Sequence, residues 1–368
     1  MKVLVINSVC GIRSTGRIAT DIADEYISKG HKCRVAYGRG EVPEKYRDIS
    51  YRIGTDLSVK INGLKARIFD NEGFNAKRET KQFIKWANDY NPDVLWLHNL
   101  HGYYINIEIL FNWIKQRPQM QVKWTFHDCW PFTGHCAHFT LVGCQKWQTQ
   151  CKNCSQKCEY PKSSLKDNSY KNYLRKKAAF CGVKDMTIIT PSCWLRDLVK
   201  RSFLKDYNVE VVHNTIDTEV FKPTESSFKA DNNIVDKFMV LGVASAWSKK
   251  KGLDDFIKLA DMLDDSYKIV LVGLTAEQIK KIPQKILCIS RTNSKEELAA
   301  IYTAADIFLN LTYEDNYPTV NLEAQACGTE CITYRTGGSV ESVRSENIIE
   351  QGDLETLVKK LNEIKACM

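Results

Sequence analysis

Short apolar runs alternate with amphipathic segments along the chain. The first run, residues 2–7, is followed by apolar residues at helical spacing from Ile18 to Ile27, and Gly30 ends that predicted helix. Similar runs predict buried strands over 33–37, 94–98, 122–127, 186–190 and 209–213. Because short apolar runs joined by helices are typical of parallel sheets with both faces covered, this part of the chain predicts an α/β domain.

A second series of the same kind begins after residue 236. It predicts strands over 238–244, 268–272, 307–310 and 331–334, and helices over 252–263, 295–304, 319–326 and 354–365. Residues 214–236 hold a proline and several serines and asparagines with little periodicity, which predicts a linker. At 368 residues the chain exceeds the size of one hydrophobic core. We therefore expect two Rossmann-like domains, 1–222 and 223–368, that face each other across a ligand-binding cleft.

Basic residues are concentrated in the first predicted domain. The net charge is +8, with 35 Lys and Arg against 22 Asp and Glu in residues 1–222, and 17 against 22 in residues 223–368. Such a basic surface either contacts only solvent or binds phosphate, anionic lipid or nucleic acid. No apolar run approaches the ~18 residues that a membrane-spanning helix needs. The first run stops at Asn7, too early for a secretory signal, so we expect a cytoplasmic protein.

The segment Gly11–Arg17 joins the first strand to the first helix. It lacks the Lys and Ser/Thr of a Walker A loop, and its glycine spacing does not fit the dinucleotide fingerprint, which argues against a dehydrogenase. Glycine and small polar residues before a helix expose backbone amides to an anion. Both an ordinary turn and a phosphate site remain open for this segment.

A denser group of polar residues, Glu314–Ala324, runs from a strand end into a helix. Pro318 stands where that helix begins, so the amides that follow it are placed to meet a phosphate. Asp315 and Glu323 lie eight residues apart and suit the hydroxyls of a ribose or hexose, unless they are only solvated acids that complement the helix dipole. Residues 249–251, three lysines in a row, either form a solvated face or neutralise a pyrophosphate.

Six of the 14 cysteines fall within residues 129–158, a loop-rich insertion in the first domain. Cys136, Cys144, Cys151 and Cys154 have the number and spacing of thiolates for a structural, tetrahedral zinc site. The chemistry does not favour an iron–sulfur cluster, and the alternative is a set of reduced, unligated thiols. We expect zinc, which would stabilise a stretch that is poor in core-forming aliphatic residues.

The order and spacing of several motifs resemble the retaining, GT-B-fold glycosyltransferases of family 4, above all the bacterial exopolysaccharide and capsule enzymes of the colanic-acid type. The resemblance covers nearly the whole chain, and no single motif decides it. The segments that carry it are 6–8, 14–18, 97–103, 126–136, 190–195, 214–217, 250–253 and 314–328.

The resemblance implies roles for individual residues. Glu323 matches the second acid of an E-x7-E motif and would hold the nucleotide ribose, while Asp315, an aspartate in place of the usual glutamate, would contact the donor sugar. Lys251 matches the lysine that neutralises the donor pyrophosphate, but Ser245 stands where the family has an arginine. His127 matches a histidine near the transferred sugar. The implied donor-binding residues are Ser14, Thr15, Gly16, Lys249, Lys250, Lys251, Glu314, Asn316, Pro318, Thr319, Val320 and Glu323.

The implied activity is that of a hexosyltransferase in bacterial surface polysaccharide synthesis. It would move a sugar from a nucleotide diphosphate sugar, with UDP as the expected nucleotide, to a lipid-linked glycan, without a catalytic metal or a protein nucleophile. The basic domain would then lie against the anionic inner face of the cell membrane, and the last helix, 354–365, would cross back to the first domain. The alternatives are a sugar-nucleotide epimerase of the same fold and, from another class, a zinc-containing nucleic-acid-binding protein; we expect no nucleic acid partner.

Overall fold

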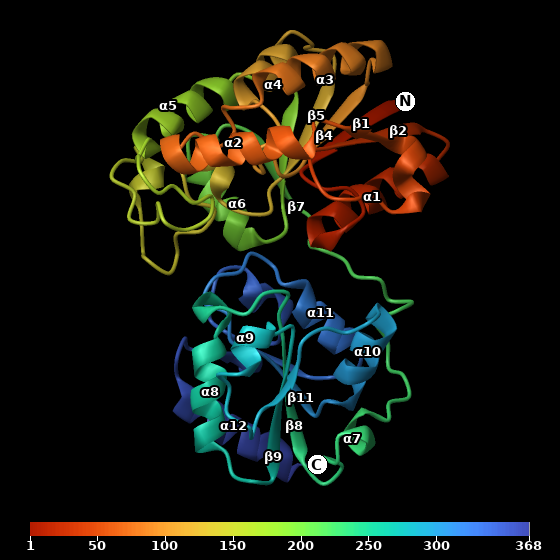
Figure 1. The fold of residues 1–368 in the computed structure, drawn as a ribbon, viewed down its shortest axis with the longest axis vertical. Helices are drawn as coiled ribbons and strands as arrows, with labels where there is room; N and C mark the ends of the chain where they lie inside the picture. The colour runs from red at the N-terminus through yellow and green to blue at the C-terminus, as the bar shows by residue number, and fades with distance from the viewer. Residues whose placement is uncertain (368) are drawn as a thin grey trace. The chain divides into compact units, whose positions relative to one another are not determined.

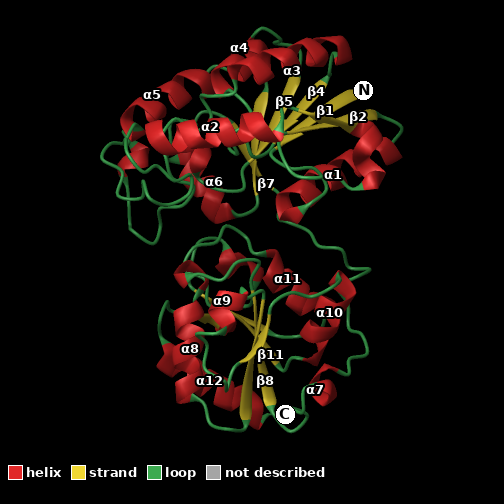
Figure 2. Cartoon of the chain, in the orientation of Figure 1, coloured by secondary structure: helices red, strands yellow, loops and turns green. Residues whose placement is uncertain are grey.

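A computed structural model describes residues 1–367 and divides them into two α/β units, residues 1–212 and residues 213–367. Each unit contains one parallel sheet with helices on both of its faces (Figures 1 and 2). The second unit begins at His213, just before the predicted linker. Two contacts tie this start to the rest of the unit: the His213 ring stacks on Tyr317 with centroids 4.6 Å apart, and the Asn214 side chain donates to the Tyr317 carbonyl at 2.9 Å.

The N-terminal unit has a seven-stranded sheet in the order β3-β2-β1-β4-β5-β6-β7. Its strands are β1 (Lys2–Asn7), β2 (Lys32–Tyr37), β3 (Ser50–Arg52), β4 (Val94–Leu97), β5 (Gln121–Thr125), β6 (Met186–Thr190) and β7 (Asn208–Val211). Val5 in β1 pairs with Val35 on one side and Trp96 on the other. Because β1 is central and both faces are covered, its apolar residues are fully buried, as its unbroken apolar run predicts.

The helices of this unit are α1 (Arg13–Ser28), α2 (Asp56–Phe69), α3 (Lys77–Tyr90), α4 (Ile107–Lys115), α5 (Ser169–Phe180) and α6 (Cys193–Lys200), with 3₁₀ turns at Glu44–Ile49, Trp130–Phe132 and Lys146–Gln148. Three of them begin with side-chain caps: Thr55 accepts from the Ser58 amide at 3.2 Å, Asn106 from the Ile109 amide at 3.0 Å, and Ser192 from the Leu195 amide at 3.2 Å. Such caps satisfy amides that have no partner inside the helix.

The start of α1 differs from the sequence prediction. Ser14 and Thr15 were expected in the loop before the helix, but the helix already begins at Arg13, so they lie in its first turn together with Gly16. Gly11, with a φ of +68°, reverses the chain just before it, and its amide donates to the Gly16 carbonyl at 3.1 Å. The early start leaves these residues at a helix N-terminus that no side chain caps.

The C-terminal unit has a six-stranded parallel sheet in the order β10-β9-β8-β11-β12-β13. Its strands are β8 (Phe238–Val243), β9 (Tyr267–Val272), β10 (Leu287–Ile289), β11 (Ile307–Asn310), β12 (Cys331–Tyr334) and β13 (Ile348–Ile349). Its helices are α7 (Phe228–Asp231), α8 (Leu253–Met262), α9 (Ala276–Ile279), α10 (Lys295–Ala304), α11 (Thr319–Ala326) and α12 (Leu354–Ala366), with 3₁₀ turns at Lys249–Lys251, Ser339–Ser342 and Ser345–Asn347. The two sheets confirm the predicted pair of Rossmann-like domains.

Both ends of this unit pack into its own core. Phe221 and Ile234, inside the predicted linker, are buried in the C-terminal core, so much of that segment belongs to the folded unit. Leu357 and Leu361 of α12 are also buried there, where α12 packs against α8. One face of the last helix therefore packs within the C-terminal unit, and its crossing to the first domain stays a prediction.

Among residues 1–367, no helix is both long and apolar enough to cross a membrane.

Candidate functional site

The lysine turn at residues 249–251 is fixed to the end of β11 by backbone contacts. The Tyr313 amide donates to the Lys250 carbonyl at 2.8 Å, and the Thr312 hydroxyl donates to the same oxygen at 3.3 Å. Gly252 follows with a φ of +74°, and a Cβ there would lie 2.2 Å from the Leu311 carbonyl oxygen. Only glycine permits this approach, which brings the lysines beside residues 311–315 at the carboxyl edge of the sheet.

Two ion pairs join the lysine turn to the acidic segment. Lys251 Nζ lies 2.7 Å from Asp315 Oδ2, and Lys250 Nζ lies 3.0 Å from Glu314 Oε2. The Glu314 side chain is only 2% exposed, whereas that of Lys251 is 38% exposed. The inner pair therefore anchors the turn, and the Lys251 amino group of the outer pair stays partly accessible to solvent. The structure brings together lysines and acids that the sequence predicted as one site.

A second turn covers the same segment from the other side. The Gly338 amide donates to the Asp315 carbonyl at 3.2 Å, and Gly337 has a φ of +49°. A Cβ on Gly337 would lie 1.9 Å from that carbonyl oxygen, so the position requires glycine. The lysine turn and this glycine turn therefore both contact the segment 311–315.

Helix α11 begins directly after this segment. Pro318 is its N-cap residue and no side chain caps its first amides, which include those of Thr319 and Val320. Beneath the helix, the fully buried Asn321 accepts from the Asn310 amide group at 2.8 Å and donates to the Ser342 hydroxyl at 2.9 Å. This buried network fixes the helix on the sheet with its N-terminus, where an anion is favoured, at the carboxyl edge.

Glu323 lies on the second turn of α11 and is 7% exposed. The Tyr302 hydroxyl donates to its Oε2 at 3.3 Å. Glu323 is thus not a solvated surface acid, which was the alternative to a role in the site. Its partner Tyr302 could not be foreseen from the sequence, because Tyr302 comes from a different helix, α10.

In the N-terminal unit, His127 and His98 form a pair at the carboxyl edge of the sheet. They follow β5 and β4, which are neighbours, and His127 Nε2 lies 2.9 Å from His98 Nδ1. Burial lowers the pKa of His127 to about 4 and lowers that of His98 well below its usual range. Both rings are therefore neutral at neutral pH, with one ring donating to the other.

A second polar group, not predicted as functional, lies beside this pair. His101 Nε2 is 2.8 Å from Asp128 Oδ2, and His101 Nδ1 is 2.8 Å from the Tyr160 hydroxyl. Burial opposes ionisation of Asp128, but the neighbouring His101 lowers its pKa to about 2. Glu72 accepts from the Gly102 amide at 2.7 Å and so fixes the loop that carries His101. The sequence signal for this group is that His101 and Asp128 each follow one of two adjacent strands.

The turn that precedes α1 reaches the same edge. Asn7, at the end of β1, is fully buried and accepts from the Asn99 amide at 3.2 Å. Because β1 and β4 are neighbours, the N-terminus of α1 with Ser14 lies on the edge that also carries His98. The site residues predicted in the N-terminal unit thus lie along one edge of its sheet.

We expect acidification to destabilise the protein through His127. Its pKa, about 4 in the folded protein and 6.5 ordinarily, is lowered by folding, so the unfolded chain takes up the proton first as the pH falls. The free energy of unfolding should therefore fall between pH 6.5 and about 4, with His98 acting in the same direction. Urea denaturation at about pH 7 and about pH 5 measures the loss, which should be smaller in His127→Gln. An equal loss in both proteins would contradict this assignment.

The cysteines of the insertion pack together. Cys136 and Cys151 are buried, the Cys136 thiol hydrogen-bonds Cys154 and lowers its pKa to about 7, and Cys151 accepts from the Gly134 amide at 3.2 Å. Within residues 1–367, no group of three or more His, Cys, Asp and Glu side chains has an arrangement that could hold a metal ion. Zinc binding by Cys136, Cys144, Cys151 and Cys154 stays a prediction, which metal analysis of protein purified without chelator tests.

The chain is similar to known proteins in sequence over part of its length and in fold over nearly all of it. Residues 224–367 match the glycosyl transferases group 1 family. WcaC of Escherichia coli (strain K12), described as a colanic acid biosynthesis glycosyl transferase, is 26% identical over 170 residues, which are 44% of this chain and 41% of WcaC. The N,N'-diacetylbacillosaminyl-diphospho-undecaprenol alpha-1,3-N-acetylgalactosaminyltransferase of Campylobacter jejuni is 30% identical over 115 residues, 30% of each chain. The chain therefore matches less than half of the length of these relatives.

Solved structures share the fold of the whole chain. Sucrose-phosphate synthase from Thermosynechococcus elongatus has a TM-score of 0.71 at 14% identity and covers 99% of this chain and 90% of its own. HepE of Anabaena, solved in complex with UDP, has a TM-score of 0.66 at 13% identity and covers 98% and 89%. Residues 224–367 thus form a glycosyl transferases group 1 domain, in a chain with the two-domain, Rossmann-like GT-B fold.

Proposed function

We propose that the protein is a retaining glycosyltransferase that moves a hexose-type sugar from a nucleotide diphosphate sugar to a hydroxyl of a lipid-linked glycan. One observation carries the proposal: Lys251, paired with Asp315, stands in the same unit as the uncapped N-terminus of α11 and the buried Glu323. Together these groups supply a cation and free amides for the diphosphate and a carboxylate for hydroxyls, which a nucleotide diphosphate sugar requires. All of these residues fall within the matched family region.

In the proposed reaction the bond between the sugar C1 and the donor phosphate oxygen breaks, and a bond from C1 to the acceptor oxygen forms on the same face. The departing nucleoside diphosphate takes up the acceptor proton. Breaking the C1–oxygen bond leaves its electron pair, and so negative charge, on the diphosphate before the proton is taken up, and Lys251 and the amides of Thr319 and Val320 stabilise that charge. Glu323 accepts hydrogen bonds from the ribose, Asp315 contacts the sugar, and the neutral His127 orients the sugar. We expect neither a catalytic metal nor a protein nucleophile.

We propose UDP as the nucleotide and a lipid-linked oligosaccharide of bacterial surface polysaccharide synthesis as the acceptor. The HepE structure with UDP supports the first choice, and the diphospho-undecaprenol in the name of the Campylobacter relative supports the second. The excess of basic residues in 1–222 fits an acceptor at the anionic inner face of the cell membrane.

Nucleotide release from a panel of sugar nucleotides tests this function. The first step is a thermal-shift screen of UDP-, GDP-, ADP- and CDP-sugars, and the best one is then incubated with and without lipid-linked acceptor. We expect UDP release that increases with acceptor, and a product with the anomeric configuration of the donor sugar by NMR. Isomerised donor with the nucleotide still attached would indicate an epimerase, and salt-sensitive RNA or DNA binding without a sugar-nucleotide shift would indicate a nucleic-acid-binding protein. Either outcome would overturn the proposal.

A further inference from the structure

Tyr160 lies just after the cysteine-rich insertion, residues 129–158, and combines a hydrogen-bonded hydroxyl with an exposed ring. Its hydroxyl is 2.8 Å from His101 Nδ1, yet the residue is 42% exposed, so part of the ring faces solvent. Burial raises the pKa of this hydroxyl well above its usual range, so it stays protonated and can donate to His101. The Ala137 amide donates to the Tyr160 carbonyl at 3.4 Å, which ties the residue to the insertion.

His101 connects Tyr160 to an ionised carboxylate. Asp128 Oδ2 lies 2.8 Å from His101 Nε2, and Asp128 Oδ1 accepts from the Trp130 amide at 2.9 Å. Burial opposes ionisation of Asp128, but His101 lowers its pKa to about 2. A neutral His101 then carries its proton on Nε2, toward the carboxylate, and accepts from Tyr160 through Nδ1. This chain of hydrogen bonds fixes the Tyr160 ring, which meets the His101 ring edge-on with centroids 5.4 Å apart.

The loop that carries His101 is strained, and a buried carboxylate holds it. Gly102 and Tyr103 have φ values of +121° and +69°, and a tyrosine keeps such a φ only where its surroundings enforce it. Glu72, which is 5% exposed, accepts from the Gly102 amide at 2.7 Å and from the Tyr103 amide at 3.0 Å. Strained backbone of this kind is concentrated at active sites and ligand-binding sites, which favours a role in binding for this loop.

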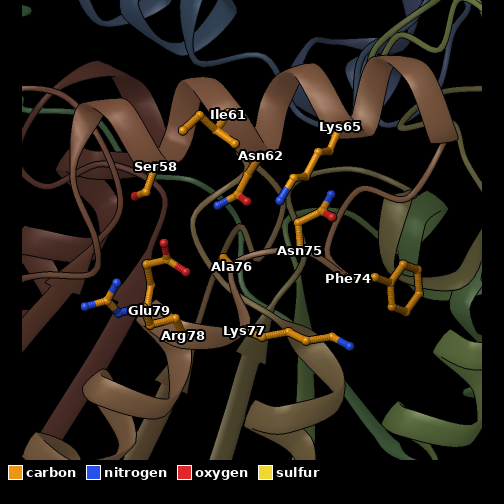
Figure 3. A pocket seen from close by; sticks show the side chains of 10 residues that line it. All are labelled: Ser58, Ile61, Asn62, Lys65, Phe74, Asn75, Ala76, Lys77, Arg78 and Glu79. Carbon is orange, nitrogen blue, oxygen red and sulfur yellow. The ribbon is translucent and has the colours of Figure 1, made fainter.

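Glu72 comes from the connection between α2 and α3. Figure 3 shows this connection below α2, where Asn62 of the helix and Phe74 and Asn75 of the connection line a cavity of about 410 Å³. Glu72 is not one of the residues that line this cavity, and both amides that it accepts from belong to the loop after β4. Through Glu72, the connection therefore contacts the carboxyl edge of the sheet, the edge on which His127 also lies.

Arg39 brings a positive charge to the same loop. It follows β2, and its amide donates to the Ser8 carbonyl, just after β1, at 3.0 Å. A Cβ on Gly102 would lie 3.5 Å from Arg39 Nε, so the guanidinium lies against the Gly102 backbone. The Arg39 side chain is half-buried, and no hydrogen bond or ion pair found within residues 1–367 engages it. Its donors are therefore available to a ligand, and their planar fork matches the oxygens of a phosphate.

Arg39 and Tyr160 are close enough to bind one ligand. Burial raises the pKa values of the Tyr160 hydroxyl and of Glu72, and the positive charge of Arg39 opposes both rises, which places the guanidinium near both groups. In the part of the chain that the structure describes, no ion pair joins Arg39 to Glu72. The negative face of an aromatic ring attracts the C–H groups of a sugar, and a guanidinium attracts a phosphate. Together the two side chains suit a sugar that carries a phosphate.

We propose that Tyr160 and Arg39 bind the phosphate-bearing sugar of the acceptor, with the sugar ring on Tyr160 and its phosphate or diphosphate on Arg39. The identity of this ligand as the acceptor rests on the proposed function. Asp128, which holds His101, directly follows His127, the residue that would orient the transferred sugar. The acceptor hydroxyl therefore belongs to the phosphate-bearing sugar itself or to a sugar close to it in the glycan.

Titration of the full chain with glucose 1-phosphate, with UDP present to fill the proposed donor site, tests the binding without any transfer. We expect glucose 1-phosphate to bind more tightly than glucose or inorganic phosphate, because only glucose 1-phosphate engages both side chains. Arg39→Gln should weaken this binding roughly 30-fold, since hydrogen bonds to a charged group are lost. Arg47→Gln removes the same charge from an exposed position of the same unit and should bind within about twofold of the original protein. Equal losses in these two variants would overturn the proposal.

Two substitutions of Tyr160 separate its ring from its hydrogen bond. Tyr160→Ala should weaken glucose 1-phosphate binding about tenfold, whereas Tyr160→Phe, which keeps the ring, should weaken it by no more than about threefold. Tyr170→Ala is the matched control, because it removes another tyrosine of the same unit, one that is 48% exposed, and should leave the affinity unchanged. Equal losses in Tyr160→Ala and Tyr160→Phe would make Tyr160 only a structural link to the insertion and would overturn the proposal. Thermal unfolding shows which variants are folded, and the Arg39 comparison decides if Tyr160→Ala is not.

Transfer assays distinguish this inference from the proposed function. Tyr160→Ala and Arg39→Gln should raise the KM for a lipid-linked acceptor while the KM for the donor stays the same, and an acceptor with a single sugar on its diphosphate should be a substrate. An unchanged acceptor KM in both variants of an active enzyme would overturn the inference and leave the proposed function standing. Binding of glucose 1-phosphate that depends on both side chains, in a chain that releases no nucleotide from any donor, would support the sugar-phosphate site and overturn the proposed function.

Discussion

Replacing Lys251 by alanine is expected to lower kcat for sugar transfer by about 100- to 1,000-fold. Removing one group that stabilises charge in a transition state has typically cost this much in other enzymes. Lys251 is placed for that role because its amino group is partly exposed and held 2.7 Å from Asp315 at the carboxyl edge of the sheet. The measurement is the rate of nucleotide release at saturating donor and acceptor.

Two further variants test whether the loss of rate is specific to the Lys251 amino group. Lys281→Ala removes an exposed lysine of the same unit, one without a place in the site, and should leave kcat within about twofold. Lys251→Arg keeps the charge and should recover part of the rate, although a guanidinium does not reproduce the geometry of an amino group. Comparable activity of Lys251→Ala and Lys281→Ala would remove Lys251 from the mechanism. Thermal unfolding establishes that each variant is folded.

Glu323→Gln should weaken nucleotide binding by about 100-fold. Hydrogen bonds to a charged group contribute about 1.5–3 kcal/mol each, and two ribose hydroxyls would lose the carboxylate as acceptor. The substitution preserves the shape of a side chain that is 7% exposed, so the fold should persist. Isothermal titration with UDP measures the affinity.

Tyr302→Phe is the matched control for Glu323. It deletes the hydroxyl that donates to Glu323 at 3.3 Å but leaves the carboxylate in place. Because that hydroxyl contacts the carboxylate and not the nucleotide, losing it should change nucleotide affinity by no more than about fivefold. If Tyr302→Phe and Glu323→Gln weaken UDP equally, Glu323 acts through the packing of α10 and α11 rather than by contact with the nucleotide.

The sequence predicts the strands and helices whose pattern is set by simple burial. The bounds expected for β6, β11, β12, α10 and α11 are those of the structure, because each strand is a short, mainly apolar run and both helices begin at a clear N-terminal signal. Helices α2 and α3 were not predicted. In α2 the apolar side chains Leu57, Ile61 and Leu64 point to solvent, and α3 buries few side chains along a mostly charged sequence.

Candidate sites made of neighbouring residues could likewise be predicted from the sequence, whereas sites joined across distant segments could not. Residues 314–323 are contiguous and lie at a strand-to-helix junction, so their grouping could be read from the sequence alone. The His101, Asp128 and Tyr160 contacts join residues from three distant segments, and only the order of the strands brings them together. Likewise, nothing in the residues around Asn62 indicates that its amide is buried without a partner.

The two glycine contacts at the edge of the C-terminal sheet have a thermodynamic consequence. Gly252 packs on the Leu311 carbonyl and Gly337 on the Asp315 carbonyl, so contacts within the protein hold both turns that border the site. A nucleotide that binds there has little backbone to order and meets a small loss of conformational entropy. Gly337→Ala would displace the glycine turn from the Asp315 carbonyl. The nucleotide would then have more backbone to order, so titration calorimetry should show a more unfavourable entropy of binding.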